Sequence, residues 1–424
     1  MEPNQSLADS LSGWPRFLEG GLVWSGTGAS PAGPHIVQLQ PVDIAEIESA
    51  LKAFKELGYH GDKVSSDTFR LSQNLQSRLR DASHDVHSKQ GHCLLRGLEP
   101  NKYSPEDNAM IFLGIASHIG DVRGVQDSDG NMLSHITVVQ QWKNVPDRLR
   151  HGVHTEQGMP FHNDMGTSVL ALHYRQCASE GGSTHLSSAW TVYNELSANY
   201  PDVLEALATP NWPIQITKAK SRYYLAPLIQ YKHGNLMVSL DPGRLGRQTA
   251  NAEYKATKFP PFLGDNAKTC DKAAEVPALT EKQNEALDTF NKVAHEHRLS
   301  VPARPGDMLF VNNWALLHAR DPYMDGSAGG AGRRHLVRVW LHDQELSWDP
   351  PDSMKTPWAA AFGHRFPDSI EQTGGPHRRN KVNHKYPIMP AVNYQVPKYT
   401  AGSAAFVVDS SDDEDDDHLD RCQS

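Results

Sequence analysis

Residues 161–166 are Phe-His-Asn-Asp-Met-Gly, and the largely apolar run Thr-Ser-Val-Leu-Ala-Leu-His-Tyr follows at 167–174. Side chains at positions i and i+2 of an extended strand point the same way, so we expect His162 and Asp164 on one side of the chain. The run that follows them has the composition of a buried strand. This stretch therefore predicts a core strand with two metal-binding side chains at its mouth.

His318 is the third candidate ligand. It follows the turn Arg304-Pro-Gly-Asp307 and the apolar run 308–311, which together favour a rigid β-strand platform. Two histidines and one carboxylate are the protein ligands of non-haem Fe(II) oxygenases, and three ligands leave positions open on an octahedral metal. The pair His154 and Glu156 has the same spacing, but no apolar strand follows it, so we rank this pair second.

The chain is expected to begin with helices and to continue mainly with strands. Helices are predicted at 43–58, 70–87, from Ser104-Pro105 onward, at 191–207 and at 280–297. The clearest strands are predicted at 92–97, 132–140, 168–174, 223–231, 236–240, 308–311 and 336–341. Asp43 is expected to cap the first helix. This order predicts an α+β protein built on a β-sandwich or barrel.

We interpret residues 36–400 as a single domain, with a helical N-terminal part at 36–118 and a C-terminal extension at 346–400. An arm rich in Gly, Pro and Ser precedes it at 1–35, and its two tryptophans, Trp14 and Trp24, are expected to anchor it. Residues 401–424 are expected to form a disordered acidic tail, because they combine high charge with few apolar side chains.

The formal net charge of -9 is concentrated near the end of the chain. Residues 409–420 carry eight acidic side chains and Arg421 follows, so this tail supplies -7 and the remainder only about -2. A body so close to neutral has no electrostatic footprint for nucleic acid or for an anionic membrane. We therefore expect neither as a partner.

The cysteines and the apolar segments favour a reducing compartment. The four cysteines show no CxxC spacing, which predicts neither a disulfide framework nor a zinc knuckle. We see no signal peptide and no apolar run of membrane-spanning length. We expect a soluble, cytoplasmic protein, with a nuclear location as the alternative, and leave its oligomeric state open.

Five motifs occur in an order that resembles a known family. They are FHND (161–164), GGSTHLSS (181–188), PGDMLFVNN (305–313), LLHAR (316–320) and RRHLVR (333–338). Over roughly residues 90–345 the chain resembles the taurine dioxygenase (TauD/TfdA-like) family of Fe(II)/2-oxoglutarate-dependent oxygenases, particularly its fungal branch. The resemblance implies a clavaminate synthase-like fold, a double-stranded β-helix (jelly-roll) core with flanking and inserted helices.

The same resemblance implies site residues and cofactors. His162, Asp164 and His318 match the iron ligands, with 2-oxoglutarate and O₂ as co-substrates. Thr184, after a Gly-Gly turn, matches the family's hydroxyl contact to 2-oxoglutarate. Arg334 matches the arginine that holds the distal carboxylate of 2-oxoglutarate, and a guanidinium fork suits a carboxylate on chemical grounds.

The arginines also carry the main departures from the family. The segment 326–332 lengthens the connection between the distal histidine and Arg334, so Arg333 or Arg320 could take the role of Arg334. Arg338 lies four residues after Arg334 on the same strand and therefore faces the same side. The equivalent position in taurine dioxygenase meets the anionic group of the substrate, which implies that an acidic substrate is one option.

Three further residues are candidate substrate contacts. Gln126 and His135 lie in a polar run that, in this fold, is expected to roof the pocket; a hairpin with capping polar side chains is the alternative. Asn313 precedes the distal-ligand segment and is expected to orient it or to contact substrate.

We expect, from these residues and the resemblance, an enzyme that oxidises an unactivated C–H bond of a small molecule and releases succinate and CO₂. The substrate would be a small sulfonate or carboxylate, or an amino-acid-derived metabolite. The alternatives are a catalytically silent jelly-roll module that recruits a partner through its acidic tail, and a nuclear demethylase, which the near-neutral body disfavours.

Overall fold

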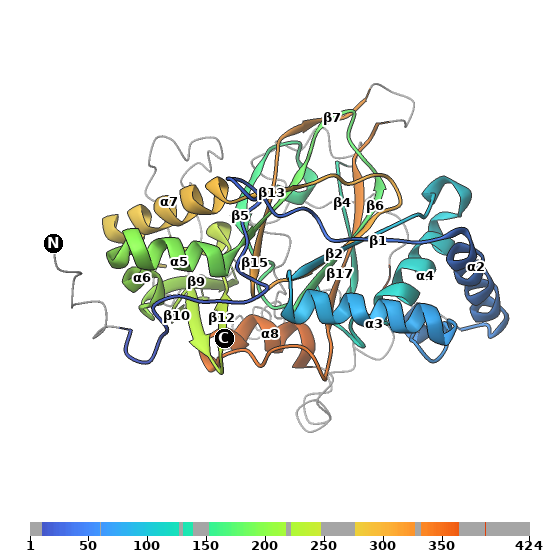
Figure 1. Ribbon diagram of the computed structural model, residues 1–424, viewed down its shortest axis with the longest axis horizontal. Coiled ribbons are helices and arrows are strands. Elements are labelled where there is room, and N and C mark those ends of the chain that lie inside the picture. Colours follow the sequence, from blue (N-terminus) through green and yellow to red (C-terminus); the bar gives the residue numbers. More distant parts are fainter. Residues whose placement is uncertain are drawn as a thin grey trace, which may run out of the picture.

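Two β-sheets pack against each other at the centre of the molecule, and helices lie to either side of them (Figure 1). The computed structural model describes residues 11–59, 61–126, 130–138, 152–217, 222–246, 276–326, 332–363 and 386. The predicted acidic tail at 401–424 lies outside the described residues. The mixture of helices and sheets agrees with the α+β prediction.

The larger sheet has the strand order β1-β2-β14-β6-β17-β3, and β4 also pairs with β17. Its strands are β1 (Ile36–Gln38), β2 (His92–Arg96), β3 (Val122–Arg123), β4 (Leu133–Thr137), β6 (Val169–Gln176), β14 (Met308–Asn312) and β17 (His335–His342). Alternate residues of β17 face opposite ways: Leu336 and Trp340 enter the core between the sheets, whereas Val337 and Val339 face the helices.

The smaller sheet has the order β13-β8-β15-β5 and is antiparallel throughout. Its strands are β5 (Met159–His162), β8 (Thr184–Ser188), β13 (Leu299–Val301) and β15 (Leu316–Arg320). The chain crosses from this sheet to the larger one between β5 and β6, and from the larger sheet back to this one between β14 and β15. These two crossings bring the segments around 162 and 318 to the same place.

Two groups of helices enclose the sheets (Figure 1). The helices are α2 (Pro41–Glu56), α3 (Gln73–Ser88), α4 (Pro105–Ala116), α5 (Ala189–Asn199), α6 (Pro201–Ala208), α7 (Glu281–Glu296) and α8 (Lys355–Phe362). Helices α2 to α4 share a hydrophobic core with the outer face of the larger sheet. Helices α5 to α7 pack together beside the smaller sheet, within the core that the two sheets share.

Among the described residues, three two-stranded sheets accompany the two larger ones. They pair β9 (Trp212–Thr217) with β10 (Arg222–Ala226), β11 (Ile229–Lys232) with β12 (Asn235–Val238), and β7 (Glu180–Gly181) with β16 (Tyr323–Met324).

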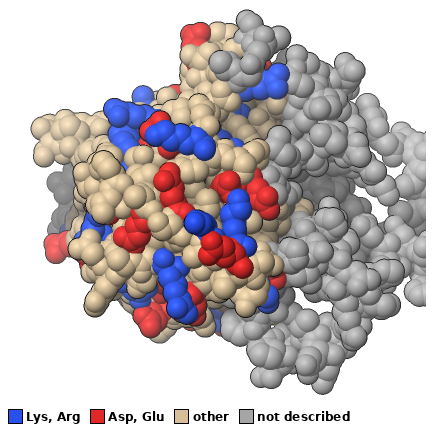
Figure 2. All heavy atoms as spheres, turned by 90° about the vertical axis from the view of Figure 1, so that its right-hand side faces the viewer, with Lys and Arg blue, Asp and Glu red and all other residues tan. Residues whose placement is uncertain are grey.

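Positive and negative side chains are interspersed over the face that carries α2 and α4 (Figure 2). Several of them form ion pairs, such as Lys55 with Asp107 and Lys102 with Glu99, each at 2.7 Å. This mixture of signs agrees with the near-neutral charge of the body. Within the described part of the chain, no helix combines the length and apolar character needed to cross a bilayer.

The first helix begins earlier than predicted, and the prediction of Asp43 as its cap was wrong. Gln40 is the cap, and Asp43 is the third helical residue, where its Oδ2 accepts a hydrogen bond from the Gln40 amide at 2.7 Å. Pro41 occupies the first helical position, which needs no N–H donor. The proline therefore moves the start of the helix toward the N-terminus.

Two other predicted elements are each divided in the structure. The helix predicted at 191–207 is broken at Tyr200, because Pro201 begins a new helix, α6. The strand predicted at 223–231 is two strands, β10 and β11, separated by Pro227 and Leu228. In both cases a proline ends a periodic apolar pattern that otherwise continues.

The N-terminal arm is anchored by its tryptophans, as predicted. Trp14 packs against Tyr193 and Tyr231, with ring centroids 6.2 and 6.1 Å apart. The Trp24 indole donates a hydrogen bond to the Gln90 carbonyl at 2.9 Å. The described part of the arm is therefore fixed to the domain.

Candidate metal centre

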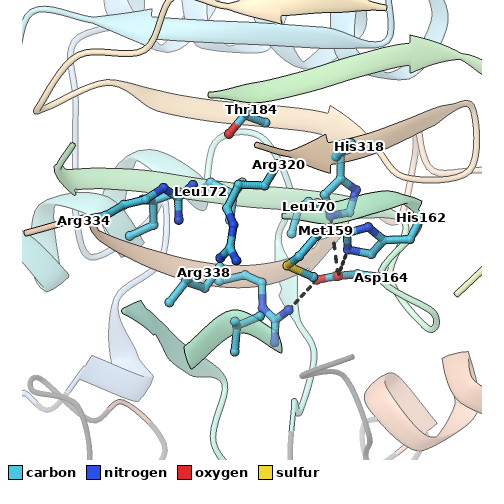
Figure 3. Close-up of a pocket in the computed structure, with 14 residues that line it drawn as sticks. Met159, His162, Asp164, Leu170, Leu172, Thr184, His318, Arg320, Arg334 and Arg338 are labelled. Atoms are coloured by element: carbon cyan, nitrogen blue, oxygen red, sulfur yellow. Dashed lines mark hydrogen bonds and ion pairs between the residues drawn. The ribbon is translucent and has the colours of Figure 1, made fainter. Parts of the chain in front are cut away.

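His162, Asp164 and His318 come together in a buried cluster (Figure 3). His318 of β15 is the cross-strand partner of His162, the last residue of β5, and the ring centroids lie 4.1 Å apart. Asp164 Oδ1 lies 4.0 Å from His162 Nε2 and 3.7 Å from His318 Nε2. Within the described residues this is the one group of three metal-ligating side chains whose ligand atoms all lie within 4.8 Å of one another.

The competing pair does not join this cluster. His154 lies in the short 3₁₀ turn Gly152–His154, where its Nδ1 contacts the Thr137 carbonyl at 3.1 Å. Glu156 accepts a hydrogen bond from the Asp325 amide at 3.5 Å. The structure therefore agrees with placing this pair second.

The two oxygens of Asp164 have different surroundings. Oδ2 accepts hydrogen bonds from Arg338 Nη1 and Trp340 Nε1, both at 2.8 Å. Arg338 is itself held, since its Nε lies 2.8 Å from Gln126 Oε1 and 3.2 Å from Ser134 Oγ. Oδ1 is thus the oxygen that faces the two imidazoles and that suits a metal ion.

The protonation states also suit metal binding. Burial lowers the pKa of His318 to about 3, so its imidazole is neutral near pH 7. Burial by itself raises the pKa of Asp164, but Arg338, the two histidines and Trp340 outweigh it and hold the value at about 2. The His162 Nδ1 lies 2.8 Å from the Pro160 carbonyl, which favours a proton on Nδ1 and a free lone pair on Nε2. A divalent transition metal requires ligands in these deprotonated forms.

Asn313 fixes the backbone of the metal-binding turn. Its Oδ1 accepts a hydrogen bond from the Asp164 amide at 3.1 Å, and its Nδ2 donates to the carbonyls of Asp164 at 2.7 Å and Thr167 at 3.0 Å. In return, Asn163 Nδ2 donates to the Asn313 carbonyl at 2.7 Å. The connection between β14 and β15 therefore holds the turn that follows β5.

A cavity extends from the cluster toward Arg334 and Thr184 between apolar walls that include Leu170 and Leu336 (Figure 3). Arg334 is 3% exposed, and its Nη1 has no hydrogen-bond partner among the described residues. The Tyr174 hydroxyl donates to Thr184 Oγ1 at 2.8 Å, which leaves the proton of Thr184 free to be donated into the cavity. Both polar side chains thus suit an anionic ligand.

The other predicted site residues are placed as follows. Arg338 and Arg320 also line the cavity, whereas Arg333 is half-buried and does not. Gln126 and His135 lie outside the cavity lining, where Gln126 binds Arg338, and His135 Nδ1 lies 2.8 Å from His335 Nε2. Their roles as substrate contacts, like that of Asn313, stay predictions.

Trp340 and Tyr174 were not predicted from the sequence as residues of the site. Trp340 lies two residues after Arg338 on β17, so the alternation of a strand places both on the cavity side. Tyr174 is the cross-strand partner of Leu336 and contacts Thr184 from the larger sheet. The spacing of Trp340 was a usable signal, whereas nothing local to Tyr174 identifies its partner.

A buried pair of histidines with one carboxylate, beside a cavity with unpaired guanidinium donors, defines the class of non-haem iron and 2-oxoglutarate-dependent dioxygenases. The sequence model of the taurine catabolism dioxygenase TauD, TfdA family matches residues 53–340, and the chain belongs to this family. With its triad in place, the protein is a dioxygenase of this class, with iron, 2-oxoglutarate and O₂ as its cofactors and co-substrates.

Two proteins of known sequence are similar to this chain over much of its length. The chain is 32% identical over 348 residues to the taurine hydroxylase-like protein SAT17 of Stachybotrys chartarum. The aligned region covers 81% of this chain and 84% of that protein. It is 24% identical over 265 residues to the FR-33289 synthase of Streptomyces rubellomurinus, covering 59% and 69% of the two chains.

Solved structures share the fold. An asparagine oxygenase in complex with Fe(II), 2S,3S-3-hydroxyasparagine and succinate aligns with a TM-score of 0.55 and 15% identity, over 73% of this chain and 94% of that one. The non-heme iron oxygenase OrfP in complex with Fe and alpha-ketoglutaric acid gives a TM-score of 0.50 and 18% identity over the same shares.

Proposed function

We propose that this dioxygenase oxidises an unactivated C–H bond of a small molecule, with conversion of 2-oxoglutarate to succinate and CO₂. One observation carries the proposal: Asp164 Oδ1 and the two imidazole Nε2 atoms converge in a buried cluster that opens on a cavity with arginine donors. We propose in addition that the two facing sheets form a double-stranded β-helix, which the crossings between β5 and β6 and between β14 and β15 support.

Each part of the site has a role in this proposal. His162, Asp164 and His318 would hold iron, whereas Arg334 and Thr184 would bind the distal carboxylate of 2-oxoglutarate. Bound iron and 2-oxoglutarate supply the oxidising chemistry. The protein orients the co-substrate through the arginine, and its apolar walls exclude water from the reacting groups.

We propose an amino-acid-derived metabolite as the substrate, ahead of a small sulfonate. Nε and Nη1 of Arg338 already have protein partners, so this arginine is less available to a sulfonate than the resemblance implies. An asparagine oxygenase among the solved structures with this fold supports the same choice. We also propose a cytoplasmic location. The intact triad does not favour a catalytically silent module.

Succinate release tests this function. Purified protein with Fe(II), O₂ and 2-oxoglutarate should release succinate slowly without substrate and faster with the right metabolite from an amino-acid-derived panel. Either His162→Ala or Asp164→Ala should reduce the release by on the order of 100-fold or more, because a ligand of the metal is lost.

His154→Ala is the matched control, since it removes a histidine of the competing pair and no ligand of the cluster. This variant should keep its succinate release. Activity that survives loss of the triad, or that disappears with His154 instead, would contradict the proposal.

A further inference from the structure

The cavity beside the metal centre contains more positive charge than one 2-oxoglutarate anchor requires. Its lining includes three guanidinium groups, of Arg320, Arg334 and Arg338, and a single carboxylate, of Asp164. Arg338 pairs with that carboxylate at 2.8 Å. Two guanidinium groups are therefore left for the remainder of the cavity.

Both of these groups are buried, and each has at least one nitrogen without a hydrogen-bond partner among the described residues. Arg320 is 6% exposed, and its Nε and Nη1 have no hydrogen-bond partner among the described residues; the same holds for Nη1 of Arg334. A guanidinium group stays protonated at neutral pH, so both side chains carry a positive charge into the interior. Among the described residues neither guanidinium has a carboxylate partner, and buried cationic donors left unsatisfied are strongly unfavourable, which indicates that the cavity is built to receive an anion.

Arg320 lies between the metal ligands and Arg334 (Figure 3). It follows His318 by two residues on β15, so both side chains emerge on the same side, and it is the cross-strand partner of Thr184. The Arg320 guanidinium lies 5.0 Å from the centroid of the Tyr323 ring, and that of Arg334 lies 5.4 Å from the same centroid. The two cations thus share one aromatic support.

The orientation of Arg320 is set by its third nitrogen. Nη2 donates to the Thr155 carbonyl at 3.0 Å and also to the Gln157 carbonyl, in the segment that leads into β5. This anchoring uses Nη2, while Nε and Nη1 remain without a hydrogen-bond partner among the described residues. A preoriented guanidinium loses little conformational entropy when it binds a carboxylate.

We propose that Arg320 is a second carboxylate-binding residue, which shares with Arg334 the distal carboxylate of 2-oxoglutarate. The inference rests on the proposed function, because it takes 2-oxoglutarate as the anion. A carboxylate has lone pairs for several donors, so Nη1 of Arg334, the free nitrogens of Arg320 and the Thr184 hydroxyl can be satisfied together. A 2-oxoacid without a second carboxylate would leave both cations unpaired.

Calorimetry on the Mn(II)-loaded protein tests the pair without turnover. The two ligands are 2-oxoglutarate and 2-oxopentanoate, in which a methyl group replaces the distal carboxylate. Arg320→Gln should raise the Kd for 2-oxoglutarate about 10- to 100-fold, the effect of one or two charge-assisted hydrogen bonds, and leave the Kd for 2-oxopentanoate within about twofold. The preference for the dicarboxylate should fall accordingly.

Arg334→Gln is the positive reference, and Arg333→Gln is the matched control, since that neighbouring arginine does not line the cavity. An equal rise in both Kd values for Arg320→Gln would mean that Arg320 only braces the 155–157 segment, and would overturn the inference. The inference would also be overturned if Arg320→Gln preferred 2-oxoglutarate over 2-oxopentanoate as strongly as Arg333→Gln does.

If circular dichroism shows that Arg320→Gln does not fold, Arg320→Lys replaces it, because it keeps the charge but has a different donor geometry. The quantity measured is the ratio of the Kd for 2-oxopentanoate to the Kd for 2-oxoglutarate. A reduced ratio supports the inference and an unchanged one overturns it. If the wild-type protein binds no 2-oxoglutarate, the proposed function itself fails, which is a different result from binding that ignores Arg320.

Discussion

At the scale of single residues, Asp164 shows how one side chain is given two tasks. Its Oδ1 faces the imidazoles, while Oδ2 is held by Arg338 and Trp340. Donors on the second oxygen fix the rotation of the carboxylate, so its ligand atom is in place before a metal arrives. Partners of this kind typically affect metal affinity 10- to 100-fold when they are removed.

Trp340→Phe should therefore weaken metal binding by about 10-fold, since it deletes the indole donor and keeps an aromatic ring in the core. A calorimetric titration of the protein with Mn(II) measures the change. Trp314→Phe is the control, because Trp314 is equally buried but its indole nitrogen has no hydrogen-bond partner among the described residues. Equal metal affinity of the two variants would exclude a positioning role for Trp340.

At the scale of elements, the metal centre depends on how the segment after β5 is tied to the segment between β14 and β15. Asp164 lies beyond the end of β5, so strand geometry does not hold it. The three hydrogen bonds of Asn313 to Asp164 and Thr167 supply that support.

The turn before β14 is constrained by its backbone: Gly306 has φ +97°, and an added Cβ would collide with the Leu98 carbonyl oxygen.

Asn313→Ala should destabilise the protein by about 2–4 kcal/mol, because it removes three hydrogen bonds in the core and leaves their backbone partners unsatisfied. Urea unfolding measures the loss. Asn284→Ala is the control: among the described residues its half-buried side chain bonds only to the nearby carbonyls of Leu279 and Thr280, so the loss should be about 1 kcal/mol or less. If Asn313→Ala kept full stability and instead raised the KM for the substrate, Asn313 would be the substrate contact that its position in the sequence suggests.

At the scale of the whole molecule, the protein carries neutral histidines in its interior. Burial lowers the pKa of His173 and of His335 to about 3 and that of His92 to about 4. The ordinary value of an imidazole in an unfolded chain is about 6.5. Between about pH 6.5 and pH 4 the unfolded chain therefore binds more protons than the folded one.

The free energy of unfolding should therefore decrease as the pH is lowered through this window. Each of these three histidines contributes up to about 1.4 kcal/mol per pH unit. Urea unfolding of the metal-free protein at about pH 7, 6 and 5 measures the slope. His173→Phe, beside Phe112 at 5.4 Å, should reduce the slope by up to about 1.4 kcal/mol per pH unit, the share of one histidine. A slope that this variant leaves unchanged would show that His173 does not contribute.

The sequence by itself determined the three candidate metal ligands, which the structure brings together, and the types of most elements. An HxD pair before an apolar run and a histidine after a second apolar run are local patterns, which can be recognised without any tertiary contact. Where a predicted element is shifted or divided, a proline is responsible, at Pro41, Pro201 and Pro227, whereas the short strands β5, β8 and β13 were not predicted at all. The predicted domain boundaries and the acidic tail stay predictions.

Only the tertiary structure decided what surrounds the ligands. Trp340 reaches Asp164 across 176 positions of the chain, and Asn313 reaches it across 149. Such contacts depend on the packing of two sheets, which no local pattern encodes. The same packing places Arg320 in the cavity lining, where two buried nitrogens without a partner among the described residues, rather than its place in the sequence, support the proposal that it binds an anion.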